Sequence, residues 1–217
     1  MSPDLLGLAM VLATLAALVG ALVGFVVRRR SAALRAARDA HTAPWEALVL
    51  SRTDLHLSVD EHGVATLHGI ARGVRYSVTC ERASGSRAHL KVTARRLLAG
   101  GLQLWVGPRS EGASTSGDVL TDRSAFGHAL VTGDASFDAR MMVWADRDAD
   151  PGALLSEAVR AGLELFPDPV VVLDAAWLTM KLSYLSEGDL DDVRVDALRS
   201  LVSTLCGAPD ATPGASP

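Results

Sequence analysis

The hydrophobic positions of this chain form three patterns, and the first is one long uncharged run from Leu5 to Val27. As an α-helix this run is about 34 Å long, enough to cross the ~30 Å hydrocarbon layer of a bilayer. A cleaved signal peptide has a basic start and an apolar core of only about 7–15 residues. Here Met1–Asp4 is not basic and the core is longer. The pattern predicts a transmembrane helix, with residues 1–30 as a membrane anchor and its basic flank.

The charges around the run predict its orientation. Arginines follow it at Arg28–Arg30, Arg35 and Arg38, whereas only Asp4 and the α-amino group precede it. Positive flanks stay on the cytoplasmic side. We therefore expect the N-terminus outside and the rest of the chain in the cytoplasm. The two cysteines, Cys80 and Cys206, agree with a reducing compartment, although the sequence does not decide whether they ever pair.

Small residues recur within the run at Ala16, Gly20 and Gly24. Small residues four apart allow two helices to approach closely, so a homodimer through this face is one interpretation. Chance spacing in an alanine-rich chain is the other, and we favour it. Residues 31–44 are expected to form a juxtamembrane helix and a linker that ends at Pro44.

The second pattern is strict alternation of apolar and polar residues, which predicts β-strands. Leu57 placed opposite Leu67 brings His56 beside His68 and leaves Gly63 as the left-handed residue of a three-residue hairpin loop. Further strands are predicted at residues 74–81, 89–94 and 102–106. Together they predict an antiparallel meander over about residues 45–107, with residues 45–50 as a first strand or a short lead-in.

The third pattern combines helical stripes with short apolar runs. It predicts a strand at 137–144, a helix at 151–166, strands at 170–174 and 177–184, and a last helix from about Ser186. Ser186 and Asp189 are spaced like a capping box. The chain is thus predicted to carry one soluble α+β domain at 45–206, whose half at about 131–206 has the order β-α-β-β-α. Residues 207–217 are rich in proline and small residues and are expected to be a disordered tail.

The acidic net charge of the chain argues against one class of partner. The whole chain carries a formal net charge of −4, and the part after residue 30 is more acidic because three of the arginines lie in the anchor. Nucleic-acid binders need a basic footprint. We therefore expect no nucleic-acid partner.

One stretch supports a resemblance to other proteins. Residues 132–146 contain Phe137-Asp138-Ala139-Arg140 followed by an acidic segment. This stretch resembles uncharacterised bacterial membrane-anchored proteins in which a Phe-Asp-x-Arg/Lys strand precedes a helix, a hairpin and a closing helix. The resemblance covers about residues 130–206. It implies the β-α-β-β-α order but no activity, and it carries no functional residue over to this chain.

Acidic residues suggest a calcium loop that the sequence then argues against. Asp146, Asp148, Asp150 and Glu157 stand at positions 1, 3, 5 and 12 of an EF-hand loop. Position 6 must turn sharply and is normally glycine, but here it is Pro151, whose φ is fixed near −65°. A solvated loop with Asp150 as helix N-cap is the favoured interpretation.

Histidines suggest a second candidate site. His56 and His68 are expected to be cross-strand neighbours, but two ligands are too few for zinc, and His89 could join them only if its strand lay alongside. Cys80 falls on the apolar face of its strand and is expected in the core. We assign no catalytic, cofactor-binding or metal-binding residue.

The sequence therefore predicts a non-enzymatic, membrane-tethered cytoplasmic domain that binds an unknown protein partner or acts as a structural support. A hydrolase or transferase with a site built from His56, His68, His89, Asp146 and Asp148 is one alternative. A small-ligand or calcium sensor is another.

Overall fold

The computed structural model describes residues 24–25, 28–29, 42–81, 88–97, 103–109, 126–146, 155–183 and 185–207. Most of the predicted span at 5–27, including Ala16 and Gly20, lies outside these residues, as do Asp148, Asp150 and residues 208–217. Residues 24–25 and 28–29 are helical. Within the described residues, no helix combines the length and the apolar character needed to cross a membrane. The chain divides into two compact units, Met1–Ala43 and Pro44–Pro217.

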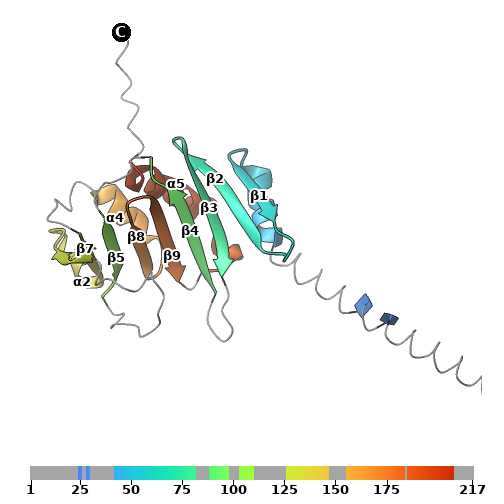
Figure 1. Ribbon diagram of the computed structural model, residues 1–217, viewed down its shortest axis with the longest axis horizontal. Helices are drawn as coiled ribbons and strands as arrows, with labels where there is room; N and C mark the ends of the chain where they lie inside the picture. The colour runs from blue at the N-terminus through green and yellow to red at the C-terminus, as the bar shows by residue number, and fades with distance from the viewer. Residues whose placement is uncertain are drawn as a thin grey trace, which may run out of the picture. The chain divides into compact units, whose positions relative to one another are not determined.

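The second unit has an α+β fold built on one antiparallel sheet (Figure 1). In its described part the sheet has nine strands in the order β1-β2-β3-β4-β9-β8-β5-β7-β6. The strands are β1 (Leu55–Val59), β2 (Ala65–Ala71), β3 (Val74–Glu81), β4 (His89–Arg95), β5 (Leu104–Pro108), β6 (His128–Leu130), β7 (Met141–Ala145), β8 (Pro169–Leu173) and β9 (Trp177–Ser183). The helical elements are α2 (Ala135–Arg140), α4 (Glu157–Glu164), the 3₁₀ turn η2 (Glu187–Asp189) and α5 (Asp192–Leu205).

The predicted β1–β2 hairpin is confirmed in its register. Leu57 pairs with Leu67, and His56 pairs with His68. Gly63 has φ +82°, and its N–H donates to the Asp60 carbonyl at 3.0 Å. A positive φ carries little strain for glycine, so the loop closes as the alternation predicts.

The predicted meander is correct from β1 to β4 and wrong at its last strand. β5 does not follow β4 in the sheet. Instead β9 pairs with β4, and β5 lies between β8 and β7. All five residues of β5 and of β8 are buried. Strands buried on both faces belong in the interior of a sheet, and the sheet therefore places both away from its edges.

Residues 45–50, predicted as a first strand or a short lead-in, and residues 137–144, predicted as a strand, both contain helix. Residues 42–51 are helical, so residues 45–50 are not a strand and Pro44 does not end the helical pattern. Trp45 and Leu48 are buried while Leu50 is 89% exposed, which is the spacing of an amphipathic helix. The predicted strand at 137–144 is also corrected, because α2 runs to Arg140 and β7 starts only at Met141.

The two later helices start further along the chain than predicted. α4 begins at Glu157 after the N-cap Ser156, and residues 151–154, where its start was expected, lie outside the described residues. The Ser186–Asp189 capping box is confirmed, but it caps η2 rather than α5. The cap of α5 is Asp191, whose carboxylate accepts a hydrogen bond from the Arg194 N–H at 2.9 Å.

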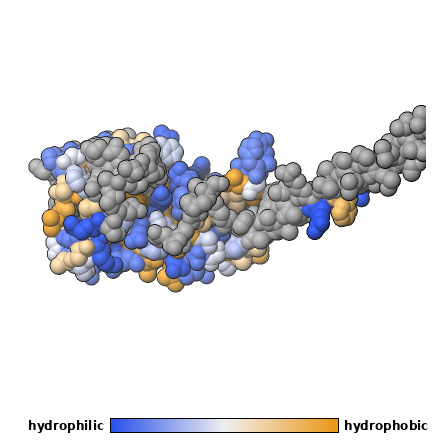
Figure 2. Space-filling model, turned by 90° about the horizontal axis from the view of Figure 1, so that it is seen from below, coloured by the Kyte–Doolittle hydropathy of each residue, from blue (hydrophilic) through white to orange (hydrophobic). Residues whose placement is uncertain are grey.

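The main core lies between the sheet and the helices that cover one of its faces, α4 and α5, which Figure 1 draws behind the strands. Cys80 packs partly buried against this core and Cys206 lies within it, and neither takes part in a disulfide bond. Burial raises the pKa of Cys206 to about 11. A smaller apolar cluster of Trp105, Phe126, Val170 and Val172 lies apart from the main core. On the side of the domain shown in Figure 2, hydrophilic and hydrophobic residues are interspersed.

An ion-pair network joins the segment before β1 to α5. The Arg52 side chain is only 13% exposed, and its Nη2 lies 2.6 Å from Asp196 Oδ1 and its Nη1 3.4 Å from Asp192 Oδ1. Arg199 Nη1 lies 3.1 Å from Asp54 Oδ2. The hydrogen bond from Arg52 lowers the pKa of Asp196, and bonds from Ser186 lower the pKa of Asp189.

These shifts predict loss of stability in acid. A carboxyl group whose folded pKa lies below its ordinary value of 3.8 stabilises the fold above that value, and this stabilisation disappears as the pH falls through the folded pKa. We expect the denaturant concentration at the unfolding midpoint, measured by tryptophan fluorescence, to decrease as the pH is lowered from about 5 to about 3. Arg52→Gln should make this fall shallower. An equally steep decrease of the midpoint with pH in the variant would contradict the role of Arg52.

Candidate functional site

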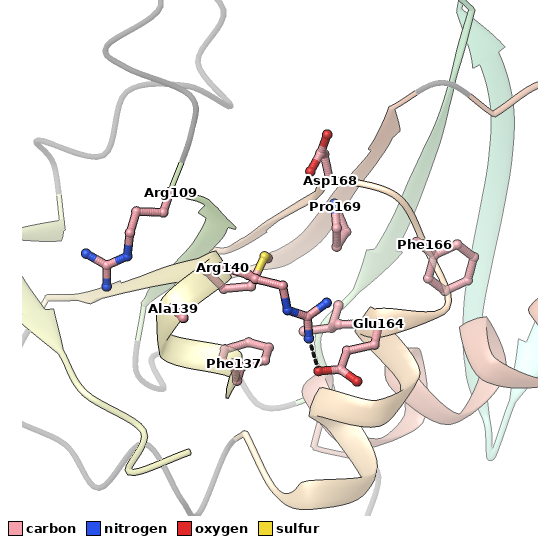
Figure 3. A pocket seen from close by; sticks show the side chains of 10 residues that line it. Arg109, Phe137, Ala139, Arg140, Glu164, Phe166, Asp168 and Pro169 are labelled. Carbon is pink, nitrogen blue, oxygen red and sulfur yellow. Dashed lines mark hydrogen bonds and ion pairs between the residues drawn. The ribbon is translucent and has the colours of Figure 1, made fainter. Parts of the chain in front are cut away.

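A pocket of about 480 Å³ opens beside α2, where three separate segments of the chain meet (Figure 3). Its floor is apolar: Phe137 is fully buried, and Leu163 and Phe166 are 1% and 3% exposed. The complete lining is Arg109, Phe137, Ala139, Arg140, Met141, Leu163, Glu164, Phe166, Asp168 and Pro169. The pocket thus lies where α2 passes into β7 and where α4 passes into β8.

Charged side chains stand around the apolar floor. Arg140 forms an ion pair with Glu164 (Figure 3), and these side chains are 58% and 41% exposed. Arg109 donates from Nε and Nη2 to the Asp138 carbonyl at 3.0 and 2.7 Å. Asp168 completes this rim and holds a left-handed backbone with φ +43°. Two arginines and two carboxylates give the lining no net formal charge.

The wall formed by α2 is fixed by two aspartates. Asp134 caps the helix, accepting from the N–H groups of Ser136 and Phe137, and it also pairs with Arg160 at 3.2 Å. The bond from the Phe137 N–H is the main reason why the pKa of Asp134 is lowered. Asp138 accepts from the Thr132 N–H, the Thr132 hydroxyl and the Gly133 N–H at 2.9–3.1 Å. These bonds hold the loop before α2 against the helix.

The Phe-Asp-x-Arg stretch therefore has three separate structural roles. Phe137 forms the floor, Asp138 anchors the preceding loop, and Arg140 stands at the rim. The stretch is helical rather than the strand that the resemblance implies. The helix turns Phe137 into the core and leaves Ala139 exposed at the pocket.

The histidines proposed as a site are not assembled into one. The rings of His56 and His68 stack with centroids 6.3 Å apart, and His68 Nε2 lies 2.8 Å from Ser58 Oγ. His89 is on β4, separated from β2 by β3, and its Nε2 lies 3.1 Å from Glu81 Oε2. None of these three histidines lines the pocket.

The two acidic candidates that the structure describes, Asp146 and Glu157, do not line the pocket. Asp146 Oδ1 accepts a hydrogen bond from the Gln103 N–H at 3.1 Å, which closes the end of the β5–β7 pair. Glu157 begins α4, and the other two proposed calcium ligands lie outside the described residues. Over the part of the chain that the structure describes, no three His, Cys, Asp or Glu side chains gather in a way that could hold a metal ion.

Sequence reasoning noticed the Phe-Asp-x-Arg stretch but not the pocket. Arg109, Glu164 and Asp168 carry no motif, and they meet α2 only because β5, β7 and β8 are neighbours in the sheet. The available signal was the pair of apolar residues, Leu163 and Phe166, at the end of a predicted helix beside an acidic residue. Comparison with protein-family models, with curated proteins and with solved structures found no match to this chain.

The lining of the pocket combines apolar and charged side chains. Its lining contains no histidine, cysteine, serine or threonine among the described residues. The apolar floor can take a hydrophobic group, and the arginines and carboxylates can orient polar groups beside it. Most ligand sites have this combination and fall between about 300 and 1,000 Å³.

Proposed function

We propose that this chain is a membrane-tethered, non-enzymatic domain that binds a protein partner in the pocket beside α2. The observation that carries the proposal is the buried apolar floor with the exposed Arg140–Glu164 ion pair at its rim. The uncharged run Leu5–Val27 and the arginines after it support the tether and its cytoplasmic orientation.

The occupant that the pocket fits best is a short segment carrying one large apolar side chain. The exposed Ala139 and the buried Phe137, Leu163 and Phe166 beneath it give that side chain apolar surroundings. Desolvated contacts at the centre of an interface supply most of its binding energy. Arg140 and Glu164 already neutralise each other. Their guanidinium and carboxylate can therefore hydrogen-bond the polar backbone of the partner without an unpaired charge being buried.

The test uses two alanines of α2. Both Ala135 and Ala139 are exposed, but only Ala139 lines the pocket. Ala139→Trp should fill the pocket, whereas Ala135→Trp adds the same bulk outside it. The measurement is cross-linking in native membranes, read by mass spectrometry. We expect the amount of the main cross-linked partner to fall at least tenfold in Ala139→Trp, which corresponds to about 1.4 kcal/mol of binding free energy. In Ala135→Trp the amount should not change.

The same membranes test the tether. The full chain should stay in the membrane pellet after alkaline extraction, and a chain without residues 1–30 should appear in the soluble fraction with a cooperative unfolding transition. Release of the full chain by alkali would contradict the tether. An identical set of cross-linked partners in the two tryptophan variants would contradict the pocket as the binding site.

A further inference from the structure

Four exposed side chains form a cross-strand row at one end of the sheet. Ile70 on β2 pairs with Arg75 on β3, and Arg95 on β4 pairs with Trp177 on β9. Tyr76 pairs with Ala94, and one residue further in the same register Arg75 lies beside Arg95. We call Ile70, Arg75, Arg95 and Trp177 the arginine–tryptophan row.

The row lies on the sheet face away from the main core. Its neighbours along the strands, among them Tyr76, Ala94 and Leu178, are at most 3% exposed and point into that core. Successive side chains of a strand point to opposite faces. Ile70 is 52% and Trp177 49% exposed, and both arginines are exposed. Leu97, two residues beyond Arg95, is 51% exposed.

Arg75 and Arg95 bring two positive charges to the row. Among the described residues, the side chains of Arg75 and Arg95 make no ion pair and no hydrogen bond. Other cations on the same strands do have partners: Lys91, for example, lies 3.1 Å from Glu81. Like charges directly opposite each other destabilise a sheet. The two positive charges of the row therefore do not add to the stability of the fold. An external anion would relieve this repulsion.

We propose that the arginine–tryptophan row contacts an anionic lipid surface. Its composition is that of a membrane-contacting surface, because arginines attract anionic head groups and tryptophan prefers the boundary between head groups and acyl chains. The inference rests on the tether proposed above. Only residues 28–43 separate the predicted span from the second unit, and even fully extended they reach at most about 55 Å. The cytoplasmic leaflet expected there carries anionic lipid.

Trp177 makes the contact measurable in the full chain. The chain is incorporated into nanodiscs of phosphatidylcholine with about 30% phosphatidylserine, or of phosphatidylcholine alone, with and without brominated acyl chains. Subtracting a Trp177→Phe variant isolates the emission of Trp177. We expect brominated lipid to quench this emission in anionic discs. In neutral discs, and in Arg75→Gln/Arg95→Gln, quenching should fall at least threefold.

The matched control is Lys91→Gln/Lys181→Gln. It removes two positive charges from the same face of β4 and β9, four residues from the row along each strand, and should leave quenching of Trp177 within about a fifth of the original. Equal loss in both double variants, or equal quenching in neutral and anionic discs, would overturn the row as a specific contact. No quenching at all, as expected if the row binds an acidic protein instead, would overturn the lipid assignment.

Elution of the chain with the discs reports on the tether separately. If the chain does not elute with them, the tether is wrong. The row is then tested by the same quenching measurement with vesicles of the two compositions, where quenching only by the anionic vesicles would still support it. Thermal unfolding of each variant confirms that the sheet is intact.

Discussion

Replacing Trp45 with alanine is expected to lower the free energy of unfolding by about 3–5 kcal/mol. Trp45 is fully buried in the main core, and it is the largest side chain that the helical segment 42–51 contributes there. Its removal leaves a cavity that the surrounding strands cannot close, because a sheet fixes the positions of its side chains. Denaturant unfolding followed by circular dichroism measures the loss.

Two variants separate packing from other effects at this position. Leu50→Ala removes an apolar side chain that is 89% exposed from the same helical segment, and it should change stability by less than about 0.5 kcal/mol. Trp45 Nε1 is buried without a hydrogen-bond partner among the described residues. Trp45→Phe should therefore cost much less than alanine, since it removes an unsatisfied donor while keeping most of the volume. A similar loss in Leu50→Ala and Trp45→Ala would show that the segment does not pack as described.

Gly69→Ala is expected to destabilise the protein by about 1–3 kcal/mol, although alanine normally improves a strand position occupied by glycine. The reason lies across the strand pair, where Tyr76 is the partner of Gly69. A Cβ atom on Gly69 would lie 2.3 Å from Tyr76 Cζ and 2.4 Å from its Oη. The ring itself is only 3% exposed, and its burial raises the pKa of the phenol to about 12. The ring cannot move aside without disturbing the core.

A double-mutant cycle tests this explanation. Tyr76→Val alone should destabilise by loss of the ring, but in that background Gly69→Ala should become neutral or stabilising, because the atoms it would meet are gone. Gly188→Ala is the control, since nothing lies within 4 Å of a Cβ atom there. The same cost for Gly69→Ala with and without the ring would disprove the contact.

The candidate site shows where local pattern stops being informative. Asp134, Asp138 and Arg140 lie in a stretch that stands out in the sequence, yet their roles depend on partners up to 29 residues away. No periodicity encodes that Arg109 will bond to the Asp138 carbonyl or that Glu164 will face Arg140. The arginine–tryptophan row is a similar case, because Trp177 joins it only through the pairing of β9 with β4.

The sequence by itself determined those strands, turns and helix caps that are specified by residues close together in the chain. Alternation of apolar and polar residues predicted β1 to β4 and the register of the first hairpin, because side chains of period two must share a face and Gly63 permits the left-handed turn. Short apolar runs located β8 and β9, and the spacing of Ser186 and Asp189 located their capping box. The transmembrane helix at Leu5–Val27 remains a prediction of the sequence alone.

Only the tertiary structure decided where those elements lie and which of two local conformations wins. β9 lies between β4 and β8 in the sheet. The sequence did not predict this position, because the order of strands along the chain does not fix their order in a sheet when long connections intervene. Residues 45–50 and 137–140 are helical because burial of Trp45 and of Phe137 outweighs their weak local preference for strand. The pocket beside α2 and the place of Trp177 beside Arg95 follow from that arrangement, since both depend on contacts between residues far apart in the chain.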